Sequence, residues 1–130
     1  MNQKSRILII DDDNVVHQSC TPEYEKLGYD VSSLEDGSGN IVEKVLEIKP
    51  DVIHLDLIMP GPSGFEVLRT LKSDERTKNI PVFVVSNIIS FPEEVQKSLD
   101  LGAVDHISSA EFDPSEIAAK VVSHLQDRSV

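Results

Sequence analysis

The stretch RILIIDDD, residues 6–13, decides the fold of this chain. A run of branched apolar residues that ends abruptly is typical of a strand in a parallel sheet, where helices cover both faces. Three aspartates end this run. Four further segments of strand character follow along the chain: Tyr29 to Leu34, Asp51 to Leu55, Pro81 to Val85 and His106 to Ile107.

Between these segments, apolar residues recur at the three- and four-residue spacing of amphipathic helices. The apolar positions are Val16, Cys20, Tyr24 and Leu27; Ile41, Val45 and Ile48; Phe65, Leu68 and Leu71; Val95 and Leu99; and Ile117, Val121 and Leu125. Strict alternation of five strands and five helices predicts an α/β fold, a doubly wound (βα)5 five-stranded parallel sheet of flavodoxin-like type. Pro22 falls inside the first helical pattern, so we expect a kink or break there.

Composition and charge narrow the function classes. The 130 residues predict one domain, 1–130, with little room for a separate output module. A formal net charge of −11 argues against nucleic acid and anionic membranes as partners. No apolar run is long enough for a signal peptide or a membrane span. The single cysteine, Cys20, is expected to be a small buried residue of a cytoplasmic protein.

Polar side chains follow the predicted strands at the point where each ends. They are Asp11, Asp12, Asp56, Ser86 and Ser109. Ligands of doubly wound sheets bind beyond the carboxyl ends of the strands, and the first, third and fourth strands are neighbours there. The carboxylates are therefore expected to converge and to need a cation, for which hard oxygen ligands favour Mg²⁺ or Mn²⁺. Asp56 is the carboxylate best placed to attack a phosphoryl group.

Several nearby residues have simpler structural interpretations. Asn14 is expected to cap the first helix, and Ser63 and Asp113 the third and fifth. His54 is interpreted as a hydrogen-bonded interior histidine, and His17 and His124 as surface residues. Ser109 taken alone is interpreted as a turn or capping serine.

The sequence resembles the receiver domain of two-component response regulators, in the stand-alone form similar to chemotaxis regulators. The resemblance covers nearly the whole chain. It rests on ILIIDDD (7–13), DVIHLDLIMPGPSG (51–64), PVFVVSN (81–87) and LGAVD (101–105), of which the second is the most specific.

This resemblance implies a role in a phosphorelay. Asp56 would accept a phosphoryl group from the phosphohistidine of a sensor histidine kinase or phosphotransfer protein. Asp12, Asp56 and the Ile58 carbonyl would hold Mg²⁺, with Asp11 helping through water. Ser86 would bind a phosphoryl oxygen. Apart from slow loss of this group, no enzymatic activity is implied.

The resemblance also implies how the signal leaves the site. Inward movement of Ser86 would draw the switch residue of the last strand, at the position of His106, toward the phosphoryl group. A downstream protein target would meet the face formed by the fourth helix, the fifth strand and the fifth helix, where Lys97 and Lys120 lie. Neither DNA nor a membrane is expected to take part.

The chain departs from the family at Ser109, where the family has a lysine. A hydrogen bond to a charged group contributes about 1.5 to 3 kcal/mol, so phosphoryl binding or its coupling to the switch should weaken by about one to two orders of magnitude. Two alternatives stay open: a degraded, metal-dependent phosphoacceptor, and a pseudo-receiver that signals by protein contact without phosphorylation. A third, a haloacid-dehalogenase-like phosphatase, rests on the short match of residues 11–15 to its opening motif.

Apolar bulk around the expected site favours a long-lived phosphoryl group. Ile58 and Ile88 flank the expected phosphoryl position, and Asn87 is bulkier than the residue often found there. We therefore expect attacking water to be excluded and hydrolysis to be slow.

Overall fold

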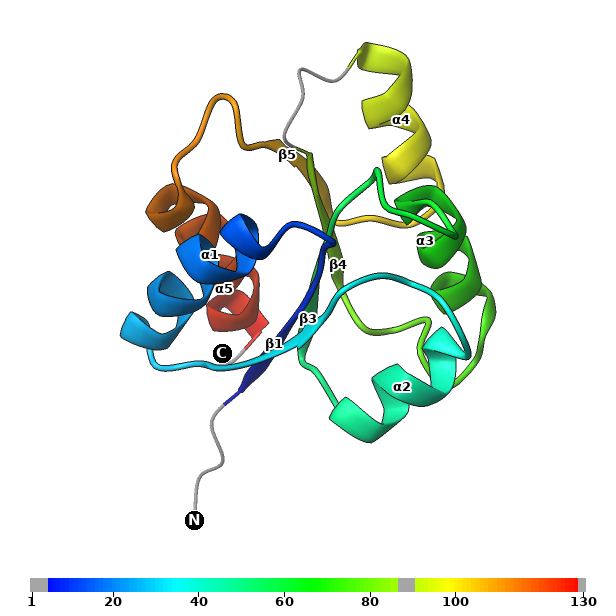
Figure 1. Cartoon of the computed structure of the whole chain (residues 1–130), viewed down its shortest axis with the longest axis horizontal. Helices are drawn as coiled ribbons and strands as arrows, with labels where there is room; N and C mark the ends of the chain where they lie inside the picture. Colours follow the sequence, from blue (N-terminus) through cyan, green and yellow to red (C-terminus); the bar gives the residue numbers. More distant parts are fainter. Residues whose placement is uncertain (1–4, 87–90, 129–130) are drawn as a thin grey trace.

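The computed structural model describes residues 5–86 and 91–128, which form a parallel sheet with helices on both faces (Figure 1). The strands are β1 (Arg6–Ile10), β2 (Asp30–Leu34), β3 (Val52–Leu55), β4 (Val82–Ser86) and β5 (Asp105–Ser108). The helices are α1 (Asn14–Lys26), α2 (Ile41–Ile48), α3 (Gly64–Ser73), α4 (Pro92–Asp100) and α5 (Pro114–Arg128). The predicted fold class and the strict alternation of strands and helices are confirmed.

The strands lie in the order β2-β1-β3-β4-β5, so β1 and β3 are adjacent although about forty residues separate them in the chain. Their register places Ile10 opposite Leu55. The backbone N–H of Asp56 then donates to the Ile10 carbonyl at 2.9 Å. The residues that directly follow these two strands are therefore held side by side at one edge of the sheet.

Side chains alternate along the central strands and form two separate cores. Leu8 and Ile10 face the core shared with α2 and α3, whereas Ile7 and Ile9 face the core shared with α1 and α5. In Figure 1, α1 and α5 cover one face of the sheet, and α2, α3 and α4 lie on the other. The central strands β1, β3 and β4 are thus buried on both sides, which explains their continuous apolar runs.

Helix starts follow the capping rules, with one correction. The side chain of Asp13, not of Asn14, caps α1 by accepting from the Val15 N–H at 2.9 Å. Ser63 caps α3 as predicted. Asp113 and Glu116 satisfy each other's backbone N–H groups at the start of α5.

The sequence predicted a kink or break at Pro22, and the break does not occur, because α1 runs without interruption from Asn14 to Lys26. A proline inside a helix costs about 3 kcal/mol. Cys20 and Tyr24 are buried on either side of it, and α1 packs along α5. Burial of this helix face offsets the cost of the proline, since most helix stability in proteins comes from tertiary packing.

The apolar stripe predicted for α4 is also wrong in part. Leu99 is 39 % exposed, and the buried residue of this helix is Ser98. The Ser98 hydroxyl donates to the Glu94 carbonyl at 3.0 Å and lies 3.0 Å from Nδ1 of His106 on β5. Hydrogen bonds rather than apolar contact therefore fill this face, and hydrophobic periodicity does not detect them.

The predicted interior position of His54 is confirmed. His54 and Tyr24 are both fully buried, and the Tyr24 hydroxyl lies 2.9 Å from His54 Nδ1. Burial lowers the pKa of His54 to about 3, so the ring is neutral at physiological pH. His124 is not the predicted surface residue, because it is half-buried with its ring edge against Phe83.

We predict that Tyr24→Phe lowers the free energy of unfolding by about 1 to 2 kcal/mol, because it leaves His54 Nδ1 buried without its partner. Urea unfolding at neutral pH measures the loss. The matched control is Tyr29→Phe, since the Tyr29 hydroxyl makes no hydrogen bond within residues 5–86 and 91–128. Equal losses in the two variants would rule out a stabilising role for the Tyr24–His54 hydrogen bond.

Candidate functional site

Three carboxylates meet at the carboxyl ends of β1 and β3. Asp11, Asp12 and Asp56 each offer an oxygen atom, and these atoms all lie within 4.8 Å of one another. Asp11 and Asp56 are buried, whereas Asp12 is exposed. The register of β1 with β3 explains this convergence, which the sequence predicted from the strand order.

Burial and crowding raise the proton affinity of this carboxylate cluster. The pKa of Asp56 is raised to about 7, first by burial and then by the charge of Asp11, while the N–H groups of Ile58 and Leu57 oppose the shift. Burial also raises the pKa of Asp11 to about 6. In the described residues, no ion pair of lysine or arginine reaches these aspartates. The cluster is therefore able to hold a cation, which would reverse these shifts.

His17 supports the backbone of this site, which the sequence did not predict. Its Nε2 lies 2.7 Å from the Asp11 carbonyl oxygen, so Nε2 carries the proton and donates it. Its Nδ1 is buried and has no hydrogen-bond partner among the described residues. His17 is half-buried instead of lying at the surface. Its spacing to Cys20 and Tyr24, on the buried stripe of α1, is the signal that indicates this position.

The loop after Asp56 is folded tightly against the start of α3. The Gly64 N–H donates to the Leu57 carbonyl at 2.8 Å. A Cβ atom at residue 64 would overlap the backbone carbonyl of Asp56, so only glycine allows this approach. Ile58, which belongs to this loop, is 62 % exposed. The PGPSG segment thus fixes the backbone that carries Asp56.

The two predicted hydroxyl residues lie at the same edge of the sheet. Ser86 ends β4, is 1 % exposed and pairs with Ser108 of β5. Its carbonyl accepts from both the N–H of Ser109, at 2.8 Å, and the Ser109 hydroxyl, at 3.1 Å. The Ser109 hydroxyl is therefore engaged with the backbone of β4. Asn87 and Ile88, which were expected to narrow the site, lie outside the described residues.

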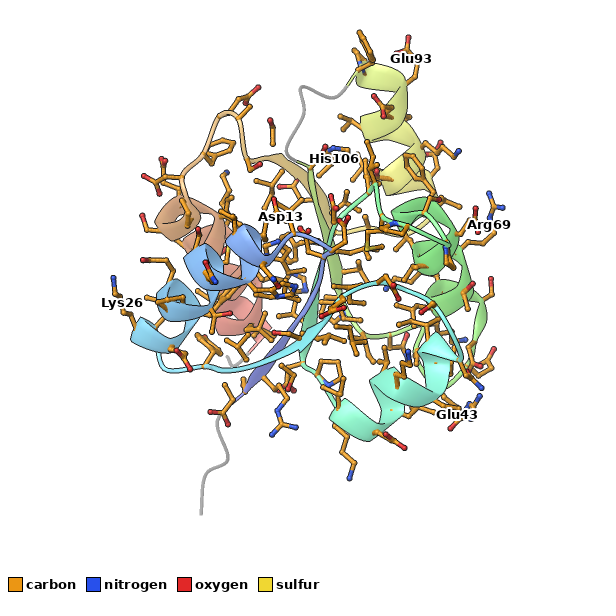
Figure 2. All side chains as sticks on the ribbon, viewed as in Figure 1. Asp13, Lys26, Glu43, Arg69, Glu93 and His106 are labelled. Carbon is orange, nitrogen blue, oxygen red and sulfur yellow. The ribbon has the colours of Figure 1, made fainter. Side chains whose placement is uncertain are left out.

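His106, the predicted switch residue, lies on β5 and faces α4. Figure 2 shows it beside the sheet on the side toward α4, while Asp13 lies at the end of β1. Its Nδ1 contact with Ser98 joins β5 to α4. Burial lowers the pKa of His106, and the charges of Glu94 and Asp105 oppose this effect. The side chain is half-buried, so it has a partner on α4 and also a path to solvent.

Comparison with known proteins identifies the same kind of domain. Residues 7–122 match the response regulator receiver domain. The chain is 38 % identical over 122 residues to the DNA-binding dual master transcriptional regulator RpaA of Synechocystis, covering 93 % of this chain and 49 % of the relative. It is 32 % identical to the phosphate regulon transcriptional regulatory protein PhoB of Pseudomonas aeruginosa, covering 92 % and 51 %. The chain thus spans about half the length of these relatives.

A solved structure has the same architecture. The chemotaxis protein CheY4 of Vibrio cholerae superposes with a TM-score of 0.79 at 25 % identity, covering 96 % of this chain and 98 % of that one. The flavodoxin-like parallel sheet predicted from the sequence is thereby confirmed.

The prediction about partners, which excluded nucleic acid, is wrong. RpaA is described as a DNA-binding regulator, and so is MtrA of Mycolicibacterium smegmatis, which is 30 % identical over 95 % of this chain. The net charge of −11 describes only these 130 residues, whereas the relatives are about twice as long. The charge argument therefore does not extend to these longer relatives.

No helix in the described parts of the chain has the length and apolar character needed to cross a bilayer.

We predict that the stability of chelator-treated protein falls as pH rises from about 4 to about 7. The folded-state pKa of Asp56, about 7, exceeds the ordinary value of 3.8, so the folded state binds this proton more tightly than the unfolded chain. This contribution to stability is complete below pH 3.8 and is lost as pH rises through the folded-state pKa. Thermal unfolding midpoints across this pH range measure the effect.

Asp56→Asn should flatten this pH dependence, because the amide does not titrate. The control is Asp13→Asn, which removes an exposed charge near the site while asparagine still caps α1. A profile for Asp56→Asn that is as steep as that of the unmodified chain would show that Asp56 is not the titrating group.

Proposed function

Because this chain belongs to the response regulator receiver domain family of two-component systems, we propose that residues 1–130 form a phosphorelay switch whose phosphoryl acceptor is Asp56. The observation that carries this proposal is the convergence of Asp11, Asp12 and Asp56 within 4.8 Å. The donor is the phosphohistidine of a histidine kinase. The result of phosphorylation is a change in a protein interaction surface.

The ligand atoms at the site fit Mg²⁺, or Mn²⁺ in its place. Three carboxylates and a backbone carbonyl are hard oxygen ligands, which these ions prefer. Asp12, Asp56 and the Ile58 carbonyl would hold the ion, and Asp11 would contribute through water. When bound, the ion supplies positive charge that neutralises the oxygens of the transferred phosphoryl group.

The transfer itself needs an ionised Asp56 next to a well-positioned donor. A carboxylate oxygen of Asp56 attacks phosphorus, the bond from phosphorus to the histidine nitrogen breaks, and the electron pair returns to the imidazole ring. Burial holds the pKa of Asp56 near 7, so a neighbouring cation favours the reactive form at neutral pH. The N–H groups of Leu57 and Ile58 hydrogen-bond the carboxylate and help to orient it.

Ser86 and His106 are proposed to transmit the change. The Ser86 hydroxyl, at the end of β4, donates to a phosphoryl oxygen. Movement of β4 affects β5 because the Ser86 carbonyl holds both the N–H and the hydroxyl of Ser109. His106 on β5 contacts Ser98, so a shift of β5 changes the position of α4.

One observation favours the alternative of a pseudo-receiver that works without phosphorylation. The Ser109 hydroxyl donates to the Ser86 carbonyl, and no lysine or arginine of the described residues pairs with the carboxylate cluster. A site without a fixed cation stabilises a phosphoryl group less well. Phosphorylation experiments separate the two possibilities.

We predict that acetyl phosphate with Mg²⁺ labels the purified chain with one phosphoryl group. Intact-mass spectrometry measures the added mass. Asp56→Asn and treatment with EDTA should each abolish labelling, because the first removes the nucleophile and the second the cation. Asp13→Asn is the matched control and should label normally.

Labelling of Asp13→Asn but not of Asp56→Asn would support the phosphoacceptor role. Absence of labelling in the unmodified chain at saturating Mg²⁺ and acetyl phosphate, with the fold intact by circular dichroism, would favour the pseudo-receiver instead. Labelling that persists in Asp56→Asn would assign the acceptor to another residue.

We predict slow loss of the phosphoryl group after the donor is removed, with a lifetime of minutes or longer. Ile58 follows Asp56 by two residues and is 62 % exposed, and we propose that its apolar side chain hinders the approach of water to the phosphoryl group. Ile58→Ala should shorten the lifetime several-fold, measured as decay of the phosphorylated mass. A lifetime of seconds in the unmodified chain would contradict this prediction.

A further inference from the structure

A cavity of about 180 Å³ lies between α1 and the start of α5, beside the carboxylate cluster. We propose that it binds a primary ammonium group on a short apolar chain, and that this ammonium supplies the fixed positive charge that the cluster lacks. The binding part of the proposal stands on the cavity alone. The part that concerns phosphorylation rests on the proposed function.

The walls of the cavity are mainly apolar and come from two helices. One side of the cavity is formed by Val15, Val16 and Cys20 of α1. The other side is formed by Phe112, which precedes α5, and by Ile117, which lies within α5. Cys20 and Ile117 are buried members of the core shared by these helices. Such walls favour an apolar chain over water.

The polar part of the cavity is acidic. Asp11 lines the cavity and also belongs to the carboxylate cluster. Asp113 lines it as well, and no lysine or arginine is among its lining residues. A ligand that combines a positive head with an apolar body therefore matches both kinds of wall, and its head would lie next to Asp11.

The charge balance of the site gives this ligand a role. A phosphoryl group on Asp56 carries a charge of roughly −1.5 to −2 at neutral pH, and Asp11 and Asp12 add their own. One divalent cation offsets only part of this total negative charge. The lysine and arginine ion pairs in the described residues involve Glu23, Glu43, Asp74 and Glu75, so none of them compensates the site. Lys120 lies at the far side of one wall residue, with its Nζ 4.5 Å from the centroid of the Phe112 ring, and it makes no ion pair with the cluster among the described residues. An ammonium group bound in the cavity would therefore add a positive charge next to Asp11.

The volume sets the size of the ligand. A protein cavity of about 150 Å³ accommodates benzene, with six heavy atoms. The cavity described here is slightly larger, so n-butylammonium, with five, fits it. The same chemistry occurs in a free amine and in the side chain of a lysine from another protein.

Titration of the full chain with n-butylammonium chloride tests binding, followed by the backbone amide NMR shifts of Ser19 and Phe112. We expect saturable binding with a Kd on the order of millimolar, as small ligands of this size achieve. Neutral n-butanol, of the same shape, should bind at least tenfold more weakly. Equal binding of the two, or no saturable shifts with the amine, would overturn the proposal.

Asp113→Asn tests the acidic wall without removing the helix cap, because asparagine also caps helices. It should weaken n-butylammonium binding by about twofold to fivefold, as expected for the loss of one exposed charge. The matched control is Asp13→Asn, which changes a helix cap in the same way but does not line the cavity. Equal weakening in both variants would assign the effect to net charge and contradict the proposal.

The rate of labelling by acetyl phosphate tests the role of the ammonium group. n-Butylammonium should raise the rate several-fold, and Ser109→Lys, which places a cation at the wall of the cavity, should remove this response. Nα-acetyl-lysine amide distinguishes the two sources: it should act like the free amine only if the cavity admits a side chain presented by a protein.

Different results would refute the ammonium site and the phosphorylation of Asp56. Saturable amine binding without any labelling would refute phosphorylation of Asp56 but leave the ammonium site standing. Normal labelling that does not respond to n-butylammonium, together with no NMR shifts, would refute the ammonium site and leave the phosphoacceptor role intact.

Discussion

The pairing of β1 with β3 is the constraint on which the rest of the structure depends. With Ile10 opposite Leu55, the next residue of each strand is an aspartate, and the backbone positions that carry the two carboxylates are held side by side. The apolar side chains of both strands are fully buried, and this burial holds the acidic groups in an arrangement that they would not adopt alone. The raised pKa values of Asp11 and Asp56 are the electrostatic consequence of that arrangement. The strand pairing that stabilises the sheet therefore also crowds two buried carboxylates, which disfavours their charged forms.

Much of this architecture could be predicted because it depends on local patterns. Mostly continuous apolar runs identified the central strands β1, β3 and β4. Strand order then brought Asp11 and Asp56 together across a long sequence separation. The features that were missed depend on tertiary contacts. His17 was assigned to the surface because periodicity does not weigh a hydrogen bond to a backbone carbonyl. Ser98 was missed because its buried partners are polar. Pro22 was expected to kink or break α1, and tertiary packing keeps this helix continuous. The exclusion of nucleic acid failed for another reason: the charge of these 130 residues does not describe the DNA-binding relatives, which are about twice as long.

Ser109 contributes hydrogen bonds but no charge at the edge of the sheet where the carboxylates lie. Its hydroxyl and its N–H both donate to the Ser86 carbonyl, so it connects β4 to the turn that follows β5. These two hydrogen bonds connect β4 and β5, although the serine side chain carries no charge. The proposed site thus has three carboxylates and two nearby hydroxyl residues but no paired cation among the described residues, and the apolar cavity opens beside the same Ser109.

The strand order also divides the site between early and late parts of the polypeptide. All three carboxylates are present once the first 56 residues have been made, whereas Ser86 and Ser109 are supplied only later. During synthesis, the emerging chain therefore contains all three carboxylates before the strands β4 and β5 exist. Divalent ions can screen the repulsion between these carboxylates at this stage, so metal availability bears on how the nascent chain matures.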